Sequence, residues 1–204
     1  MFKTIDLFAY LKGEISFKTP TYIHLETNGV GYMIHISLYT YGKLENVDRI
    51  KIYTYLQVKE DSHTLYGFAE EKEKEMFVLL ISVSGIGANT ARVILSSMTP
   101  EEVKSSILND DVARFNAVKG IGPKTAQRVI LDLKDKVLKT KTLDNVDVSI
   151  KGGASNVRNE AIAALQSLGF QRNAILKKID AVLSKGGDDM QIEDVLKQTL
   201  KLLS

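Results

Sequence analysis

The chain contains an internal repeat of seven residues, and this repeat constrains its fold more than any other feature. Gly85–Ala91 and Gly120–Ala126 agree at five of seven positions. The copies start 35 residues apart, and each follows a helical stretch and runs into a helix that contains Arg-Val-Ile-Leu. This spacing leaves room for two short helices between the copies. The repeat therefore predicts two helix-hairpin-helix units in tandem.

The residue types of the repeat suit a turn that binds phosphate. Glycine adopts positive φ without strain, so the first glycine of each copy permits a sharp bend, and the central isoleucine would anchor the turn in the core. With no side chain at the glycines, a phosphate can reach the free N–H groups and the positive dipole at the N-terminus of the following helix. Such contacts hold duplex DNA by its backbone and read no sequence.

We predict DNA-backbone contacts at both turns. Lys124 would add a charge and Thr125 a hydroxyl donor to the second turn. The full predicted set is Gly85, Gly87, Asn89, Thr90, Arg92, Lys119, Gly120, Gly122, Lys124, Thr125 and Arg128. The alternative is that Gly-x-Gly only ends a helix, and two copies in matched context argue against it. A nucleotide-binding P-loop is excluded, because no Gly-x4-Gly-Lys-Ser/Thr segment occurs.

The overall charge of the chain does not indicate nucleic-acid binding, so any such binding must come from local geometry. The net charge is +2 and the pI is about 8.6, below the value of about 9 or more that is typical of a basic DNA-binding domain. Residues 1–67 hold seven basic and seven acidic residues, and residues 68–138 hold ten of each. The absence of cysteine excludes disulfides and thiolate metal sites. We expect no signal peptide and no membrane span, since no long apolar run occurs.

Residues 1–68 are predicted to form a small antiparallel barrel. Residues 22–26, 30–37, 49–59 and 64–68 have the alternation or the β-branched and aromatic content of strands, and Asn28-Gly29 is a turn signal. Several short strands with polar turns between them favour a barrel.

Residues 69–138 are predicted to be helical. Thr99-Pro100 with Glu102 has the pattern of a capping box, and the last helix of the region carries one apolar stripe. The charged run 70–75 is interpreted as a solvated helix face. Residues 139–155 are predicted to be a flexible linker, and residues 156–204 a module of three helices whose first helix stops at Gly169.

This arrangement resembles the RuvA family of bacterial proteins that bind Holliday junctions. The markers span nearly the whole chain: Tyr10–Gly13, Asn28–Tyr32, Lys59–Asp61, Leu65–Phe68, both Gly-Ile-Gly turns and Ala164–Phe170. The resemblance implies an α+β multidomain fold with an N-terminal OB-fold barrel, a central all-α tandem helix-hairpin-helix domain and a C-terminal three-helix, UBA-like module. The first turn departs from many family members, because it has Ala88-Asn89 where they have Pro-Lys. Arg92 is a candidate substitute for the missing cation.

The resemblance also implies a function. A homotetramer would hold a four-way junction open and square and recruit the RuvB ATPase for branch migration in recombination, DNA repair and the SOS response. An octamer on DNA and a contact with the RuvC resolvase stay open. The family performs no known bond chemistry, so we expect no catalytic residue, no metal and no cofactor. The expected location is the bacterial cytoplasm, at the nucleoid.

Two further groups of residues follow from the resemblance. Glu60 and Asp61 match an acidic pin that repels phosphates at the junction crossover; the alternative is that Asp61-Ser62 only makes a turn. Leu165, Leu168, Phe170 and Leu200 match the apolar surface that contacts RuvB. The alternative is that they are core, and Leu165 shares a stripe with Ile162.

Two other classes of protein remain as alternatives. Nucleases and ligases of DNA repair also carry paired helix-hairpin-helix motifs, but we find no metal-ligand cluster and no nucleophile beside a base. His24, His35 and His63 are scattered through the strands and are interpreted as structural. An OB-fold that binds single strands would instead stack bases on its Tyr and Phe side chains.

Overall fold

The computed structural model describes residues 7–144, 154–186 and 190–203, with side chains at 7–138, 157–184 and 190–203. The chain divides into two compact units, Met1–Asn145 and Val146–Ser204, and each is described by itself. Within the described segments, no helix is both long enough and apolar enough to span a membrane.

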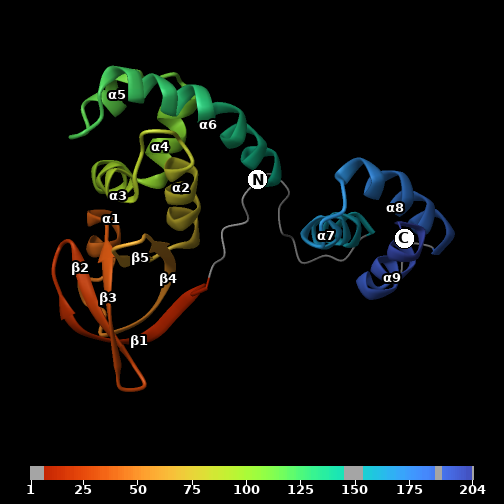
Figure 1. The fold of residues 1–204 in the computed structure, drawn as a ribbon, viewed down its shortest axis with the longest axis horizontal. Helices are drawn as coiled ribbons and strands as arrows, with labels where there is room; N and C mark the ends of the chain where they lie inside the picture. The colour runs from red at the N-terminus through yellow and green to blue at the C-terminus, as the bar shows by residue number, and fades with distance from the viewer. Residues whose placement is uncertain (1–6, 145–153, 187–189, 204) are drawn as a thin grey trace. The chain divides into compact units, whose positions relative to one another are not determined.

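The first unit contains a closed five-stranded barrel (Figure 1). Its strands are β1 (Tyr10–Lys18), β2 (Tyr22–Thr27), β3 (Val30–Ile36), β4 (Arg49–Val58) and β5 (His63–Phe68), in the order β1-β2-β3-β5-β4. The β3–β5 pair is parallel and the other pairs are antiparallel. Closure leaves no free sheet edge. The predicted OB-like barrel is confirmed, but the prediction that all of its strands pair antiparallel is wrong for β3 and β5.

The barrel buries one face of its strands. Its core consists of Leu11, Ile23, Leu25, Ile34, Ile36, Leu44, Ile52 and Leu65. The predicted turn between β2 and β3 is confirmed, since Asn28 (φ 49°) and Gly29 (φ 80°) both have the left-handed conformation that a tight hairpin requires.

Strand β1 and the short helix α1 (Leu38–Gly42) were not among the predicted elements. β1 carries Lys12, Gly13 and Glu14, and Leu11 is its only buried residue. Its sequence pattern is therefore weak. β1 is held by pairing with β2 on one side and β4 on the other, and this pairing is a tertiary effect that local periodicity does not encode.

Five helices complete the first unit: α2 (Glu71–Ile81), α3 (Ala88–Ser97), α4 (Pro100–Leu108), α5 (Val112–Asn116) and α6 (Pro123–Asp144). The capping box of α4 is confirmed, because Thr99 Oγ1 accepts from the Glu102 backbone N–H at 3.2 Å and Thr99 N–H donates to the Glu102 carboxylate at 2.8 Å. The predicted apolar stripe of α6 is buried along its length (Ala126, Val129, Ile130, Leu133 and Val137).

The predicted start of the linker at residue 139 is wrong, because α6 continues to Asp144. The residues of this last part, Lys139 to Asp144, are polar except for Leu143, which suggested a linker. They extend a helix that is already nucleated, and extension costs far less than initiation. Residues 145–153 of the predicted linker lie outside the described residues.

The barrel and the helices of the first unit share a core around Phe77. The Phe77 side chain is fully buried, and its ring centroid lies 4.9 Å from that of Phe68, 5.2 Å from Tyr66 and 5.4 Å from Tyr55. These three rings belong to strands β4 and β5. The predicted segments 1–68 and 69–138 therefore pack as one compact unit, with α2 fixed on the barrel.

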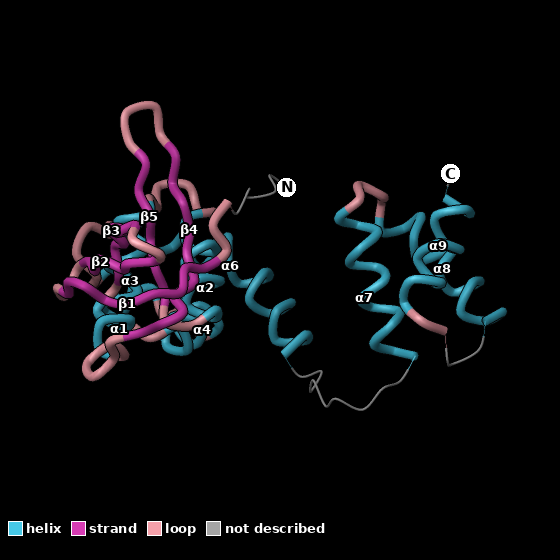
Figure 2. The backbone as a smooth tube through the Cα atoms, turned by 90° about the horizontal axis from the view of Figure 1, so that it is seen from below, coloured by secondary structure: helices cyan, strands magenta, loops and turns pink. Residues whose placement is uncertain are grey.

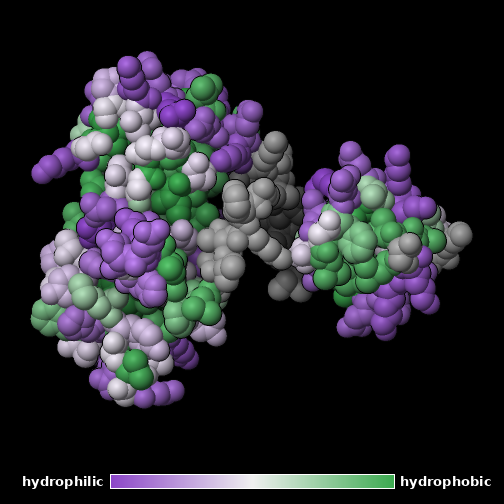
Figure 3. Space-filling model, in the orientation of Figure 1, coloured by the Kyte–Doolittle hydropathy of each residue, from purple (hydrophilic) through white to green (hydrophobic). Residues whose placement is uncertain are grey.

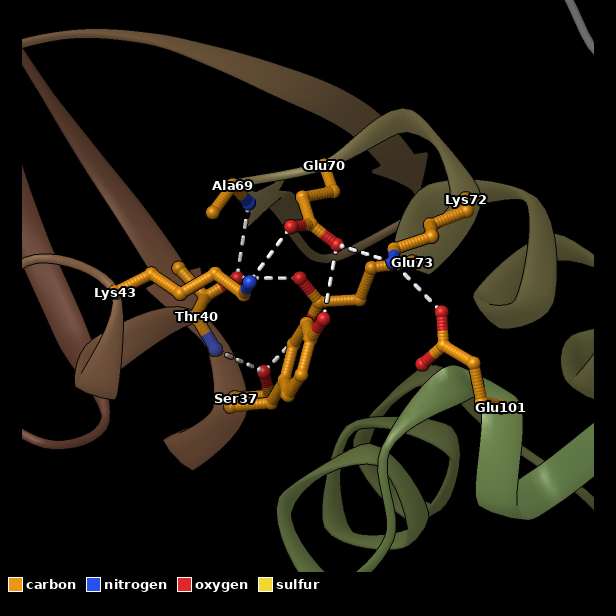
Figure 4. A network of polar contacts seen from close by, with 9 residues as sticks. Ser37, Thr40, Lys43, Ala69, Glu70, Lys72, Glu73 and Glu101 are labelled. Atoms are coloured by element: carbon orange, nitrogen blue, oxygen red, sulfur yellow. Dashed lines mark hydrogen bonds and ion pairs between the residues drawn. The ribbon is translucent and has the colours of Figure 1, made fainter.

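A buried carboxylate, that of Glu73, lies where helix α2 packs against the barrel; we call this contact the seam (Figure 4). Glu73 is fully buried, so the prediction that the charged run 70–75 is a solvated face is wrong at this position. The Ser37 hydroxyl donates to one Glu73 oxygen, and the Thr40 hydroxyl donates to the other at 2.5 Å. The Ala69 N–H in turn donates to Thr40 Oγ1 at 3.0 Å. Burial raises the pKa of Glu73 to about 7.

A chain of ion pairs through Glu70 lies next to this carboxylate (Figure 4). The Lys43 ammonium lies 2.6 Å from Glu70, and the Lys72 ammonium lies 3.2 Å from Glu70 and 2.6 Å from Glu101. The hydrogen bond from Lys43 lowers the pKa of Glu70 to about 2. Exposed pairs add little stability individually, so their main effect is to set how α1, α2 and α4 meet.

The second unit is a module of three helices, α7 (Ala154–Ser167), α8 (Arg172–Gly186) and α9 (Ile192–Leu203). The predicted stop at Gly169 is confirmed: its φ is 96°, its N–H donates to Gln166 O at 3.0 Å, and Phe170 N–H donates to Leu165 O at 3.2 Å. The module has its own core (Ala161, Ile162, Leu165, Ile175, Ile179, Val182 and Val195).

The pKa of Glu73 predicts a pH-dependent stability. Because the folded-state pKa is raised to about 7 from 4.5, the contribution of this group is complete below pH 4.5 and is lost as the pH rises through 7. Glu73→Gln removes the buried charge. We expect the free energy of unfolding of the variant, relative to wild type, to rise by about 2 kcal/mol between pH 5 and pH 8. Urea denaturation at both pH values measures this difference.

The control is Glu71→Gln, at an exposed position on the same helix. A Glu73→Gln difference that stays constant with pH would contradict the assignment of a buried, titrating carboxyl.

Candidate nucleic-acid interface

The two copies of the repeat form the same turn. Ile86 N–H donates to Val83 O at 3.0 Å, and Ile121 N–H donates to Val118 O at 3.1 Å. The first glycines of the two turns have φ of 94° and 91°. Both isoleucines are 5% exposed, which confirms their predicted role as anchors. The sequence repeat is therefore a structural repeat.

The second glycine of each turn has a different role. Gly87 has φ −85° and ψ 167°, a conformation that any residue adopts. A Cβ atom at Gly87 or Gly122 would meet no atom of the described chain within 4 Å. Neither the backbone nor the packing of this chain therefore requires glycine there. The open space lies directly before a helix N-terminus, where a phosphate would approach.

The helices that follow the turns leave their first N–H groups free. In α3 the first helical bond is from Ala91 N–H to Gly87 O at 2.9 Å, and in α6 it is from Ala126 N–H to Gly122 O at 2.9 Å. Gly87 supplies no side-chain cap, and neither helix has an acidic residue in its first turn. Helix α4 differs, because its capping box satisfies its own N-terminus.

The two hairpins are neighbours. A Cβ atom built on Gly85 of the first hairpin would lie 4.0 Å from Oγ1 and from Cγ2 of Thr125 in the second. Ile86 and Ile121 belong to one core cluster. The structure thus brings together the two turns that the sequence places 35 residues apart.

The cations of the predicted interface belong to the second hairpin. Lys119 and Lys124 are exposed, and neither forms an ion pair with another residue among those described. Arg128 is exposed and lies 4.0 Å from Asp132. Thr125, and Thr90 in the first hairpin, are half-buried. The second hairpin therefore offers charge as well as N–H groups.

Arg92 and Arg128 are not equivalent. In the second copy Gln127 stands between Ala126 and the arginine, whereas Arg92 follows Ala91 directly. One extra residue rotates a side chain by about 100° around a helix. The inserted glutamine was the sequence signal for this difference, and comparing only the shared Arg-Val-Ile-Leu missed it.

The guanidinium of Arg92 is bonded within the chain. Its Nη1 donates to Thr21 O at 3.1 Å and to Ile36 O at 3.2 Å, and its Nη2 donates to Asn89 Oδ1 at 2.9 Å. The first two acceptors belong to the barrel. Arg92 therefore faces the barrel, and it is not presented as the substitute cation that the sequence suggested.

The acidic residues Glu60 and Asp61 lie at the tip of the β4–β5 hairpin, which projects beyond the rest of the barrel (Figure 2). The tip is a tight turn in which Lys59 N–H donates to Ser62 O at 2.8 Å. Both acidic side chains are exposed, and no described cation pairs with them. The turn interpretation and a pin that presents negative charge are therefore compatible.

The four residues predicted to contact RuvB differ in how far they are buried in the C-terminal module. Leu165 is fully buried and offers no surface to a partner. Leu168 is 63% exposed, and Phe170 and Leu200 are half-buried at the edge of the core. Leu202, which the sequence analysis did not select, is 48% exposed. The visible face of this module shows apolar residues gathered among hydrophilic ones (Figure 3).

His24 and His35 pack against aromatic rings of the barrel, whereas His63, at the start of β5, is exposed. The His24 ring lies 5.1 Å from Phe17 and 5.5 Å from Tyr22, and the His35 ring lies 5.9 Å from Tyr66. Burial, and then the Arg92 charge, lower the pKa of His35. Over the part of the chain that is described, no three His, Asp or Glu side chains gather as metal ligands would.

Three family models match the chain in succession. They are the RuvA N terminal domain at residues 8–67, the SAM-like helix-hairpin-helix tandem at 77–135 and the RuvA C-terminal domain at 156–204. The chain is 50% identical over 194 residues to the Holliday junction branch migration complex subunit RuvA of Christiangramia forsetii, covering 95% of this chain and 98% of that protein.

The proteins of the same name from Cytophaga hutchinsonii and Bacteroides fragilis are 46% and 45% identical, over 96% and 95% of this chain and 100% and 98% of theirs. The chain belongs to the RuvA family. The sequence-based resemblance is confirmed, as is the order of barrel, helix-hairpin-helix tandem and C-terminal helices. The acidic tip at Glu60 and Asp61 lies within the residues matched by the RuvA N-terminal domain, and both Gly-Ile-Gly turns lie within the residues matched by the helix-hairpin-helix tandem. The domain boundaries otherwise stay predictions.

The open glycine positions generate a test. Gly122→Ala adds a methyl group that meets no atom of the chain within 4 Å. We expect the free energy of unfolding to change by less than about 0.5 kcal/mol. The affinity for duplex DNA should fall by about tenfold, because the methyl group occupies the space of a phosphate that accepts a charge-assisted hydrogen bond. Urea denaturation and fluorescence anisotropy measure the two quantities.

Gly120→Ala is the control, since its φ of 91° strains any side chain; it should lose about 1 kcal/mol or more of stability. Unchanged DNA affinity of a folded Gly122→Ala protein would exclude a phosphate at this position.

Proposed function

We propose that this chain is the DNA-binding subunit of a branch-migration complex, which holds a four-way junction by its phosphates and performs no bond chemistry itself. One observation carries the proposal: two neighbouring helix N-termini with free N–H groups, each behind a glycine that leaves open space. Sequence-independent binding follows, because N–H groups that contact phosphates read no base. The curated relatives are named as subunits of the Holliday junction branch migration complex.

The proposal includes assembly. One chain has one pair of hairpins, so a homotetramer would supply a pair for each arm of a junction. An octamer on DNA would cover both faces of the same junction. We propose the RuvB ATPase as the motor that this chain recruits and the RuvC resolvase as a further partner, at the nucleoid in the bacterial cytoplasm.

The contact surface for RuvB is proposed on the C-terminal module. Leu168, Phe170 and Leu200 expose apolar area there, whereas the buried Leu165 stabilises the module from within. Leu202 extends the exposed set. A small apolar surface of this kind on an independent module suits a protein partner rather than DNA.

The two hairpins would contribute unequally. Both present N–H groups, but Lys119, Lys124 and Arg128 place charge only near the second. The sequence-independent part of DNA affinity comes largely from cations that displace counterions. The second hairpin would therefore bind phosphate more strongly than the first.

The acidic tip would act at the junction crossover, whereas the hairpins would hold the arms. Glu60 and Asp61 project from the barrel with no described cation to neutralise them. In a tetramer, four such tips would repel phosphates at the crossover, which opposes unproductive placement of strands and helps to separate bases that enter the next arm.

Lys124→Ala tests the phosphate contact. We expect weaker binding to a four-way junction, and a plot of log affinity against log salt whose slope falls by about one counterion. Fluorescence anisotropy over a salt series measures both. Lys177→Ala, an exposed lysine on α8 outside the hairpins, is the matched control and should leave the slope unchanged.

Other outcomes would replace the proposal. If the slope of log affinity against log salt is unchanged in Lys124→Ala, Lys124 does not contact a phosphate. Tighter binding of the wild type to oligo-dT than to the junction identifies a single-strand binder. Cleavage or joining of junction DNA with Mg²⁺ and no partner protein identifies a repair enzyme.

The acidic tip has its own prediction. Glu60→Gln combined with Asp61→Asn should tighten binding to ordinary duplex DNA, because two repulsive charges are removed, and should slow branch migration with RuvB. The comparison is Glu45→Gln with Asp48→Asn, two exposed acidic residues in the α1–β4 loop of the same barrel. Loss of duplex binding by the tip variant would refute repulsion.

A further inference from the structure

Arg92 joins three separate parts of the first unit. Its Nη1 donates to Thr21 O in the β1–β2 turn and to Ile36 O at the end of β3, at 3.1 and 3.2 Å. Its Nη2 donates to the side-chain oxygen of Asn89 at 2.9 Å. Its Nε is buried. The planar guanidinium thus spans from the barrel to the first turn of α3.

A second tie holds α3 to the same side of the barrel. Leu38 N–H, at the start of α1, donates to Ser96 Oγ at 3.0 Å, and Ser96 Oγ donates to Arg92 O at 2.8 Å. Arg92 therefore has its backbone carbonyl and its guanidinium engaged in one network. This network orients the helix that follows the first hairpin.

The bond from Arg92 also orients the Asn89 amide. Asn89 is exposed, at the second position of α3, beside the free N–H groups of the helix N-terminus. An amide is planar, so when its oxygen is held by Arg92 its NH₂ end points away from the guanidinium. This end has two donors, and no described residue accepts from them.

We propose that Arg92 is a positioning residue of the first hairpin: it does not touch DNA, but it holds the Asn89 amide so that the NH₂ group donates to the phosphate bound there. This inference rests on the proposed function. Asn89 then takes at the first hairpin the place that Lys124 has at the second, as a neutral donor held in position instead of a mobile cation. Orientation replaces charge.

Lysine cannot replace arginine in this role. The guanidinium presents its donors as a rigid fork that reaches three acceptors at once, whereas an ammonium is a point charge on a flexible stem. Arg92→Lys therefore keeps the charge and removes the positioning. This distinction separates the proposal from a direct contact between Arg92 and phosphate, which lysine would largely preserve.

The test is a double-mutant cycle of Arg92→Lys and Asn89→Ala, with affinity for a four-way junction measured over a salt series. We expect each single variant to bind about tenfold more weakly, as for one hydrogen bond to a charged group. The double variant should bind no more weakly than Asn89→Ala alone. All three should keep the salt slope of wild type. Arg49→Lys, whose side chain lies 3.2 Å from Glu14 on the barrel, is the matched control.

Three outcomes would overturn the proposal. They are an Arg92→Lys variant that binds the junction as tightly as wild type, a double variant whose loss of affinity equals the sum of the two single losses, and a salt slope of Arg92→Lys that is smaller than that of wild type by one counterion. A second measurement does not depend on the folding of any variant. Side-chain ¹⁵N relaxation of the wild-type protein should show a restrained Asn89 amide, and one as mobile as that of the exposed Asn116 would refute the positioning. If neither Arg92→Lys nor Lys124→Ala changed the affinity for the junction, the proposed function itself would fail. If Lys124→Ala weakened binding and Arg92→Lys did not, only the role of Arg92 would be removed.

Discussion

The packing of Phe77 against the barrel is the interaction on which the rest of the first unit depends. Three aromatic side chains of β4 and β5 surround its ring, and one helical turn earlier the buried Glu73 accepts hydrogen bonds from Ser37 and Thr40. The apolar contact supplies binding energy, and the carboxylate admits few orientations. Helix α2 therefore fixes the later helices of the first unit, α3 to α6, with respect to the barrel.

This seam has a functional consequence. In the proposed function the hairpins would bind phosphate and the acidic tip would repel it, so their effects would combine usefully only if the distance between them is constant. Two domains on a flexible linker would lose that relation. Here the barrel and the helices form one compact unit, and Arg92 adds a direct bond between α3 and two barrel carbonyls. The same residue links stability of the unit to the geometry of its first hairpin.

In the proposed function the chain would bind DNA with little excess charge, because the uncapped helix N-termini of the hairpins would attract phosphate where other proteins use a basic surface. Helix N-termini without caps provide partial positive charge that does not count in the net charge of +2. The N-terminus of α4 differs because it is capped, and that of α2 differs because its first turn holds Glu71 and Glu73, whereas the first turns of α3 and α6 hold no acidic residue. Lys119 and Lys124 of the second hairpin would add positive charge beside these N-termini.

The sequence by itself determined the features that depend on neighbours along the chain. It identified both hairpins, the buried isoleucines, the capping box at Thr99 and the left-handed stop at Gly169, because these follow from local backbone conformation and from helical or strand periodicity. The tertiary structure alone decided the pairing of β1, the burial of Glu73 and the barrel carbonyls that accept from Arg92. Each of these depends on partners far away in the sequence, and the free energy of such contacts outweighs the local preference of the residues involved.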